Sequence, residues 1–405
     1  MPARTVLSPY TSLFTVPGAR AFSVAGWLAR LPSATVGLGT VLLVQGETGS
    51  YGVAGAVSGT LALAFAAASP QWGRAADRFG QGLVLRAATT AYLLLGLAFV
   101  VVVVADAPRW SWFVLAALTG ASAANVGSLV RARWAYALGD PGRLQTAFAF
   151  ESVVDEVVFV VGPPLATVLA ATVAPAAGFL AGMVAGVVGG FVLARLEATA
   201  PPVAAHEAGR PRPPRAGVLS ASLVVVTVTY LAMGAVFGAM DVVVVGFATA
   251  EGAPAAGGLA LACYAAGSLL AGLVYGLLRL PGTLAARFVV VAVLFGASAQ
   301  LLHLVGSLLV LVPIVFLAGL AIAPVLVSGM SLVESRVPRS GLTEGLAWTS
   351  TGLGVGVTLG SALAGRAVDA WGAQTSFAVP ALAAAAVGLF ALAGAALLRP
   401  RAVAA

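Results

Sequence analysis

The sequence contains no lysine, one cysteine (Cys263) and two histidines, and only 9% of its 405 residues are charged. One cysteine excludes an intramolecular disulfide and a cysteine-based metal site. Without lysine, the chain has no G-x-x-x-x-G-K-[ST] loop, the phosphate cradle of ATP-driven pumps. Nucleophile-elbow, CxxC and HExxH motifs are missing as well. We therefore expect a protein with no metal, no cofactor and no enzymatic activity.

Hydrophobic residues make up 60% of the chain and charged residues 9%, whereas about 25% of the residues of a soluble protein are charged. This composition predicts an integral membrane protein. The net charge of +7 does not indicate nucleic acid, because all 21 basic residues are arginines scattered between apolar segments. We interpret them as topology determinants. Residues 1–16 lack the apolar core and A-x-A site of a cleavable signal.

Hydropathy predicts twelve apolar segments, each about the ~20 residues that a membrane-spanning helix needs. The first six cover 20–45, 50–69, 83–104, 111–136, 146–171 and 176–196. The second six cover 218–247, 254–278, 285–307, 309–333, 343–366 and 374–398. Between them, residues 197–216 are rich in proline and arginine, which indicates a flexible cytoplasmic linker. We expect an N-terminal bundle over 1–196 and a C-terminal bundle over 217–405.

The arginines also predict the orientation. With the N-terminus inside, all but three of them fall at inner ends and loops; Arg109 and Arg366 fall in outer loops, and Arg30 lies within a span. Cytoplasmic loops carry an excess of basic residues, so both termini are expected in the cytoplasm. High alanine, valine, glycine and arginine without lysine is typical of a GC-rich bacterial source. We therefore expect a bacterial inner membrane.

A charged, glycine-rich stretch, G-R-A-A-D-R-F-G-Q-G-L-V-L-R over residues 73–86, lies between two long apolar runs. We interpret it as a turn. Its pattern G-x-x-x-D-R-x-G resembles the signature loop between helices 2 and 3 of the major facilitator superfamily of transporters. Gln81 and Gly82 stand where that family usually has basic residues. The alternative is a positively charged inside loop of another kind of polytopic protein.

The resemblance implies an all-α membrane protein with twelve transmembrane helices in two pseudo-symmetric six-helix bundles. The two halves echo each other, since glycine-rich runs lead to Gly73 in one and to Gly276 in the other, where the aspartate is missing. Many transporters are built from such repeats, with the substrate site near the midplane between them. The 49 glycines of this chain also suit close helix packing in lipid, because small residues let the helix backbones approach each other.

The signature loop predicts a latch on the cytoplasmic side. Asp77 can bond arginines at the end of helix 4 and face the positive N-terminus of helix 11. Ser340 would cap that helix, and Glu344 would pair with arginines of the loop. Breaking and remaking such a contact is the two-state element that alternating access requires. The latch residues would be Gly73, Arg74, Asp77, Arg78, Gly80, Arg131, Arg133 and Glu344.

Ionisable residues inside a membrane are costly and therefore candidates for function. Arg30 lies about ten residues into helix 1, and Asp155 lies at a similar depth in helix 5. We predict that these two side chains pair. Glu151 shares the helix face of Asp155, four residues away, while Glu156 points about 100° aside and serves as a partner or a protonatable group. The alternative is a structural ion pair that only joins helices 1 and 5.

Asp241 is the single acid within helix 7. Its spacing places it on one helical stripe with Tyr230, Met233 and Phe237, and the resemblance implies that helix 7 lines a cavity. We expect an amphiphilic substrate wall with a titratable group, and the alternative is that Asp241 reaches the outer surface. The predicted substrate cavity comprises Trp27, Asn125, Tyr230, Met233 and Phe237, and the predicted proton-coupling charges are Arg30, Glu151, Asp155, Glu156 and Asp241.

Gly162 and Pro163 in helix 5 resemble the Gly-Pro motif of antiporters in the superfamily, although the arginine that those antiporters carry early in helix 4 is missing here. With the apolar and aromatic cavity, this favours a monomeric secondary transporter that exports a small amphiphilic molecule by proton antiport. Its partners would be that molecule, protons and the lipid bilayer, and not nucleic acid. The alternatives are an uptake symporter or facilitator for a sugar-like nutrient, a lipid flippase of the same fold, and a membrane-embedded enzyme, for which no convergent set of reactive groups is found.

Overall fold

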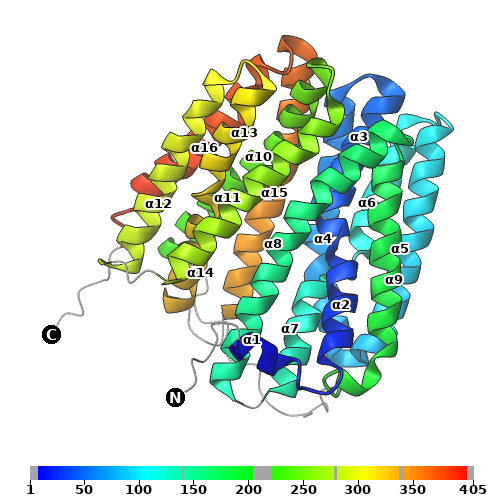
Figure 1. Cartoon of the computed structure of the whole chain (residues 1–405), viewed down its shortest axis with the longest axis vertical. Coiled ribbons are helices and arrows are strands. Elements are labelled where there is room, and N and C mark those ends of the chain that lie inside the picture. The colour runs from blue at the N-terminus through cyan, green and yellow to red at the C-terminus, as the bar shows by residue number, and fades with distance from the viewer. Residues whose placement is uncertain (1–7, 139, 204–219, 278–280, 337–341, 399–405) are drawn as a thin grey trace.

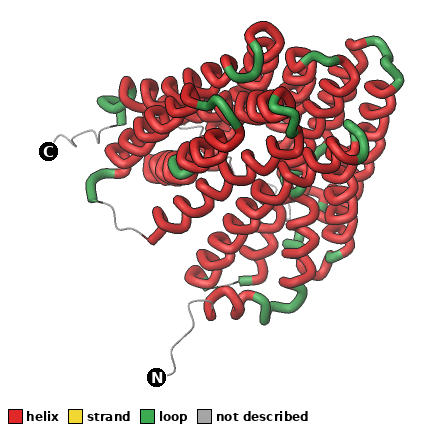
Figure 2. Tube along the Cα trace, turned by 45° about the horizontal axis from the view of Figure 1, so that its top comes forward, coloured by secondary structure: helices red, strands yellow, loops and turns green. Residues whose placement is uncertain are grey.

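The computed structural model describes residues 8–138, 140–203, 220–277, 281–336 and 342–398, and within these ranges it has helices and turns but no strand (Figure 2). Long apolar runs become helices in a membrane because lipid offers no partner for a backbone N–H, so each bonds within its own helix. Eleven helical segments are long and apolar enough to cross a membrane. A further helix of 30 residues, α15 (Leu342–Trp371), packs among them. The prediction of twelve spans is confirmed.

The first six spans follow the short helix α1 (Ser8–Leu13). They are α2 (Ala19–Arg30) with α3 (Pro32–Thr48), α4 (Tyr51–Phe79), α5 (Gln81–Val104), α6 (Arg109–Ser122) with α7 (Val126–Ala137), α8 (Pro141–Thr172) and α9 (Ala177–Arg195). After the 3-10 turn η1 (Glu197–Thr199), the second six are α10 (Ala221–Ala250), α11 (Pro254–Leu277), α12 (Leu284–Ser298) with η2 (Ala299–Leu304), α13 (Leu308–Gly319) with α14 (Ile322–Arg336), α15, and η4 (Thr375–Phe377) with α16 (Ala378–Ala393).

The spans lie side by side, and their ends form two faces (Figure 1). The α1 face is the lower end in the figure, where Leu13 of α1 packs in one apolar cluster with Ala76 and Val84 beside the α4–α5 connection. The distal face is the opposite end, where Gly49 and Gly372 lie at the rim of one pocket. These two names carry no assignment to a side of the membrane.

Three spans are interrupted along their length. Pro32 has no N–H to donate, and α2 gives way to α3 at Leu31. Residues 123–125 leave the helix between α6 and α7. Residues 320–321 separate α13 from α14. Each interruption frees backbone polar groups, which a membrane protein tolerates only where protein or a water-filled cavity satisfies them. Arg30 and Asn125 thus lie at the ends of short helical segments.

The turn predicted over residues 73–86 is wrong at every residue but Gly80. Residues 73–79 are the last two turns of α4, which continues through Pro70 to Phe79. Gly80 alone separates α4 from α5, with a φ of 88°, a conformation that favours glycine. A charged sequence with good helix formers extends a span beyond the lipid, so charge alone did not mark the end of the helix.

Glycines bring helices to backbone contact in and around the last six spans. A Cβ on Gly234 or Gly238 of α10 would overlap the backbone of α15, and a Cβ on Gly356 or Gly360 of α15 would overlap the backbone of α10. The contact of α15 with α4 is similar, since a Cβ on Gly55 would meet the backbone of Ser361. Close approach of this kind is how helices associate in lipid. The boundary between two bundles stays a prediction, because most of 197–216 lies outside the described residues.

Candidate functional site

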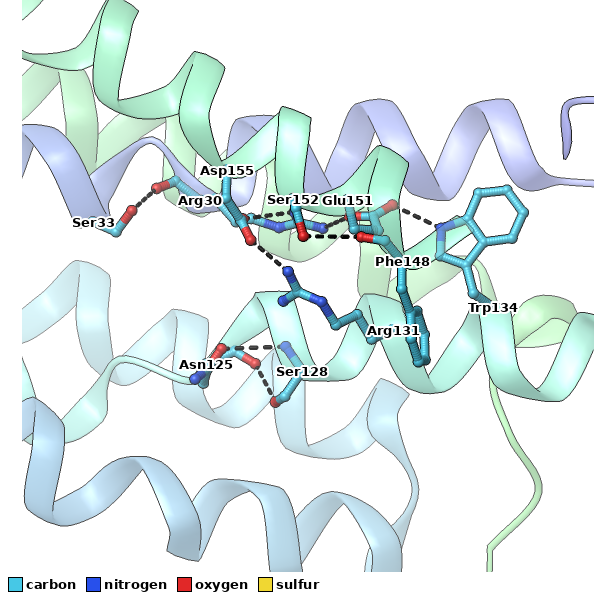
Figure 3. Close-up of polar contacts among 10 residues, drawn as sticks. All are labelled: Arg30, Ser33, Asn125, Ser128, Arg131, Trp134, Phe148, Glu151, Ser152 and Asp155. Atoms are coloured by element: carbon cyan, nitrogen blue, oxygen red, sulfur yellow. Dashed lines mark hydrogen bonds and ion pairs between the residues drawn. The ribbon is translucent and has the colours of Figure 1, made fainter. Parts of the chain in front are cut away.

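Four ionisable side chains of α2, α7 and α8 form one cluster inside the first six spans: Arg30, Arg131, Glu151 and Asp155 (Figure 3). Arg30 donates Nη1–H to Oδ1 of Asp155 at 2.9 Å, so the predicted pair is present, and donates Nη2–H to Oε2 of Glu151. Arg131 donates to Oδ2 of Asp155 at 2.6 Å. Trp134 donates its indole N–H to Oε1 of Glu151 at 2.7 Å. Each carboxylate is therefore shared by two donors.

Helix spacing explains the pairing. Glu151 and Asp155 are four residues apart on α8, and Arg131 and Trp134 are three apart on α7, so each pair lies on one helix face. Because α2 ends at Arg30, its guanidinium reaches both carboxylates from the break at Leu31. Sequence reasoning did not identify the contact of Trp134 with Glu151, and the three-residue spacing from Arg131 was the available signal.

The two halves of the cluster differ in exposure. The side chains of Arg30 and Glu151 are 5% and 1% exposed, whereas those of Arg131 and Asp155 are 33% and 34% exposed. A buried charge is costly unless it is paired and hydrogen-bonded, so Arg30 and Glu151 hold each other in place. Asp155, in contrast, joins that buried pair to the partly exposed side chain of Arg131.

Glu156, the neighbour of Asp155, points to another set of helices. Its Oε1 lies 3.4 Å from the hydroxyl of Ser268 on α11. Adjacent residues on a helix point about 100° apart. Asp155 therefore faces α2 and α7, whereas Glu156 lies in the contact between α8 and α11.

Polar groups continue the cluster toward the break in the fourth span (Figure 3). Asn125 is exposed and caps α7, its side-chain oxygen accepting the backbone N–H of Ser128 at 3.2 Å. The hydroxyl of Ser128 donates to the carbonyl of Asn125. Both lie beside Arg131 in the figure. Trp27, predicted in the cavity, is instead half-buried against Leu31 and Val158, since helix α8 covers it.

The predicted cavity wall on α10 is wrong in part. Tyr230 is 3% and Met233 0% exposed, and the phenol of Tyr230 donates to the carbonyl of Leu326 at 2.5 Å. Neighbouring helices α14, α15 and α16 cover this face, so a helical stripe alone could not tell a cavity from a core. Phe237 is half-buried against the same core. Asp241 is partly buried and has no hydrogen bond or ion pair to another described residue.

Of the latch predicted on the α1 face, the described residues show that Asp77 makes no hydrogen bond or ion pair with Arg131 or Arg133. Asp77 is exposed and makes no hydrogen bond or ion pair within the described part of the chain. Arg74 donates to Gln71 at 3.0 Å, and the guanidinium of Arg78 lies 5.1 Å from the ring centre of Phe79. The side chain of Glu344 and the whole of Ser340 lie outside the described residues.

The arginines that Asp77 was expected to bind have other partners. Arg131 binds Asp155, and Arg133 is fully buried, with Nε–H donated to Gln81 Oε1 at 2.9 Å and its other N–H groups donated to the carbonyls of Leu193 and Leu196. Gln81 also donates to the carbonyl of Leu129 at 3.2 Å. The residue at which this chain departs from the signature loop thus binds a buried arginine. That departure was the sequence signal for a contact that we did not predict.

The Gly162-Pro163 motif lies where α8 meets two other helices. A Cβ on Gly162 would run into Ala34 of α3, and a Cβ on Gly258 of α11 would meet the carbonyl of Pro163. The hydroxyl of Thr167 donates to that carbonyl at 3.0 Å. Proline removes an N–H without ending the helix, which continues to Thr172. The motif therefore lets α3, α8 and α11 approach one another closely.

Comparison with protein families decides the identity. Residues 22–254, more than half of the chain, match the family model "Major Facilitator Superfamily". The chain belongs to the Major Facilitator Superfamily. No curated protein matches its sequence significantly.

Solved structures of transporters with the Major Facilitator fold resemble the whole chain. A mutant of the nucleoside transporter NupG aligns with a TM-score of 0.71 at 15% identity, over 94% of this chain and 100% of that one. An auto-inhibited POT family peptide transporter aligns with a TM-score of 0.65 at 14% identity, over 97% and 98%. The human organic anion transporter MFSD10 (TETRAN) aligns with a TM-score of 0.62 at 16% identity, over 95% and 100%. At such identities the likeness shows the Major Facilitator fold alone.

Proposed function

We propose that this member of the Major Facilitator Superfamily is a proton-coupled secondary transporter that exports a small amphiphilic molecule by antiport. The observation that supports it is the carboxylate of Asp155, shared between Arg30 and Arg131 and partly exposed. A proton on Asp155 removes the charge that both arginines bind. The two arginines then either bind cargo or repel each other, and the arrangement of α2, α7 and α8 changes.

Glu156 is the second titratable group in this proposal. Its contact with Ser268 joins α8 to α11, so its protonation acts on the contact between the two sets of spans. Asp241 on α10 is a further candidate, since it is partly buried without an ion-pair partner among the described residues. Coupling then means that protons bound at α8 favour one conformation of the transporter and cargo the other.

The proposed orientation rests on the arginines. Among the described arginines, Arg109 and Arg366 lie at distal ends of helices and most of the others at ends on the α1 face, so the positive-inside rule favours a cytoplasmic α1 face. We propose a bacterial inner membrane with both termini inside, and a monomer as the working unit.

The experiment is transport in proteoliposomes with an imposed pH gradient. Ethidium and Hoechst 33342 serve as amphiphilic probes, a sugar as the nutrient probe and a labelled phospholipid as the flippase probe, with an internal dye reading proton flux. Dye movement against its gradient, with protons moving the opposite way, supports export by antiport. Sugar movement with protons in the same direction would replace it with the symporter. Equilibration of a dye or the sugar that does not depend on the pH gradient would show a facilitator. Movement of the labelled phospholipid between leaflets would show a flippase.

A further inference from the structure

On the distal face, one carboxylate of α15 binds the first turn of α4. Asp369 accepts hydrogen bonds from the hydroxyl of Ser50 at 2.7 Å and from the backbone N–H groups of Tyr51 and Gly52, both at 2.8 Å. These N–H groups have no partner within their own helix, and a negative charge at this end is favourable. The three charge-assisted bonds join helices that are more than 300 residues apart in the chain.

The sequence around this carboxylate is a second copy of the stretch at the end of α4. Residues 365–372 read G-R-A-V-D-A-W-G, and residues 73–80 read G-R-A-A-D-R-F-G, identical at five positions and aromatic in both at the seventh. Both copies form the last turns of a helix. Both helices end at a glycine with positive φ, 88° at Gly80 and 78° at Gly372. One copy lies on the α1 face and the other on the distal face.

The two copies are in opposite states. A Cβ on Gly365 would overlap the backbone of Tyr51, whereas a Cβ on Gly73 would meet nothing within 4 Å. Asp369 has its three bonds to α4, while Asp77 is exposed and has none in the described part of the chain. Within the described residues, the copy on the distal face is therefore docked, and the copy on the α1 face makes no such contact.

We propose that residues 365–372 are a distal latch: Asp369 holds the beginning of α4 against α15 in this conformation, and α4 must leave it before the distal face opens. The two copies then work in alternation, each docked when the other is free. The inference rests on the proposed function only in requiring two alternating conformations. It is independent of the cargo and of the proton.

The test measures how fast a cysteine placed in the contact between α4 and α15 reacts with a thiol reagent. The single native cysteine is removed by Cys263→Ala, and Ser361→Cys places a reporter in this contact, where Ser361 is 3% exposed and donates to the carbonyl of Gly55. The purified full-length protein in nanodiscs is labelled with a hydrophilic maleimide. We expect Asp369→Ala to raise the labelling rate about tenfold, the change in population that corresponds to about 1.4 kcal/mol. Asp369→Asn, which keeps one acceptor oxygen, should raise it less.

Controls separate release of the latch from damage to the fold. Glu47→Gln removes an exposed charge of the same face and should leave the rate unchanged. Ser50→Ala removes one of the three donors and is the deciding variant if Asp369→Ala fails to fold. An unchanged rate in well-folded Asp369→Ala or Asp369→Asn, or an equal rise with Glu47→Gln, would overturn the latch. Because labelling needs neither cargo nor a pH gradient, this result and the transport assay can fail separately.

Discussion

Both sets of six spans pack helices through glycines, but within the described residues the buried ion-pair network lies in the first six. Around Arg30, that network joins two arginines, two carboxylates and an indole N–H. In α10 and α15, glycines bring two backbones together, as at Gly238 and Gly356. The charged network depends on protonation, whereas the glycine contact does not. The first six spans thus contain a contact that responds to charge, and the contact between α10 and α15 is a passive one.

The largest effect should come from breaking the buried half of the network. Arg30→Ala leaves Glu151, 1% exposed, without its ion partner, and loss of one member of a buried pair costs about 3–5 kcal/mol. We expect a large fall in the thermal unfolding midpoint in detergent and loss of gradient-driven transport. Arg20→Ala, an exposed arginine of the same helix, is the control. Normal stability with transport lost would instead mark Arg30 as purely functional.

A second change tests the glycine contact of the last six spans. Gly356→Ala adds a Cβ that would overlap the backbone of Leu231, and overpacking of this kind costs about 1–3 kcal/mol. Gly37→Ala is the control, because its Cβ would meet only the hydroxyl of Ser58 at 3.8 Å. Since alanine favours a helix more than glycine does, a fall in the unfolding midpoint confined to Gly356→Ala can only be steric. Equal midpoints for both variants would contradict the rigid contact.

A third change separates stability from coupling. Asp155→Asn removes the charge shared by Arg30 and Arg131, but the site is a third exposed, so we expect a loss of only about 1–2 kcal/mol. Gradient-driven transport in proteoliposomes should nevertheless be lost, while exchange of cargo without a gradient remains. Asp106→Asn, at the exposed α5–α6 turn, should change neither. Undiminished gradient-driven transport by Asp155→Asn would move coupling to Glu156 or Asp241.

The smallest effect belongs to an ion pair at the surface. Arg86 and Glu197 are 2.9 Å apart, with side chains 48% and 65% exposed. Such pairs contribute less than about 1 kcal/mol. Arg86→Ala should therefore leave the unfolding midpoint and transport within error of the unaltered protein. A fall comparable to that of Arg30→Ala would show that burial is not what distinguishes the two arginines.

The sequence predicted what depends on local composition and helix geometry. The twelve spans follow from hydropathy, and the pairing of Arg30 with Asp155 followed from equal depth in two spans. It could not predict the burial of Tyr230 and Met233, because one helical stripe suits a core and a cavity equally. It also could not predict that Glu151 is more deeply buried than Asp155, since the neighbouring helices determine how exposed each side chain is. Asp369 was missed because an acid at a helix end is ordinary until its partner helix is known.

The interruptions of the spans have a mechanical consequence. A segment that has already lost backbone hydrogen bonds at one point bends there at little cost. The short pieces α2, α7 and α14 can therefore tilt about residues 31, 123–125 and 320–321 while α3, α6 and α13 stay in place. Two of the three levers, α2 and α7, carry the arginines that share Asp155. Arg30 lies directly beside the break at residue 31, and Arg131 lies six residues after the break at 123–125, so a change of charge at Asp155 would act close to both hinges.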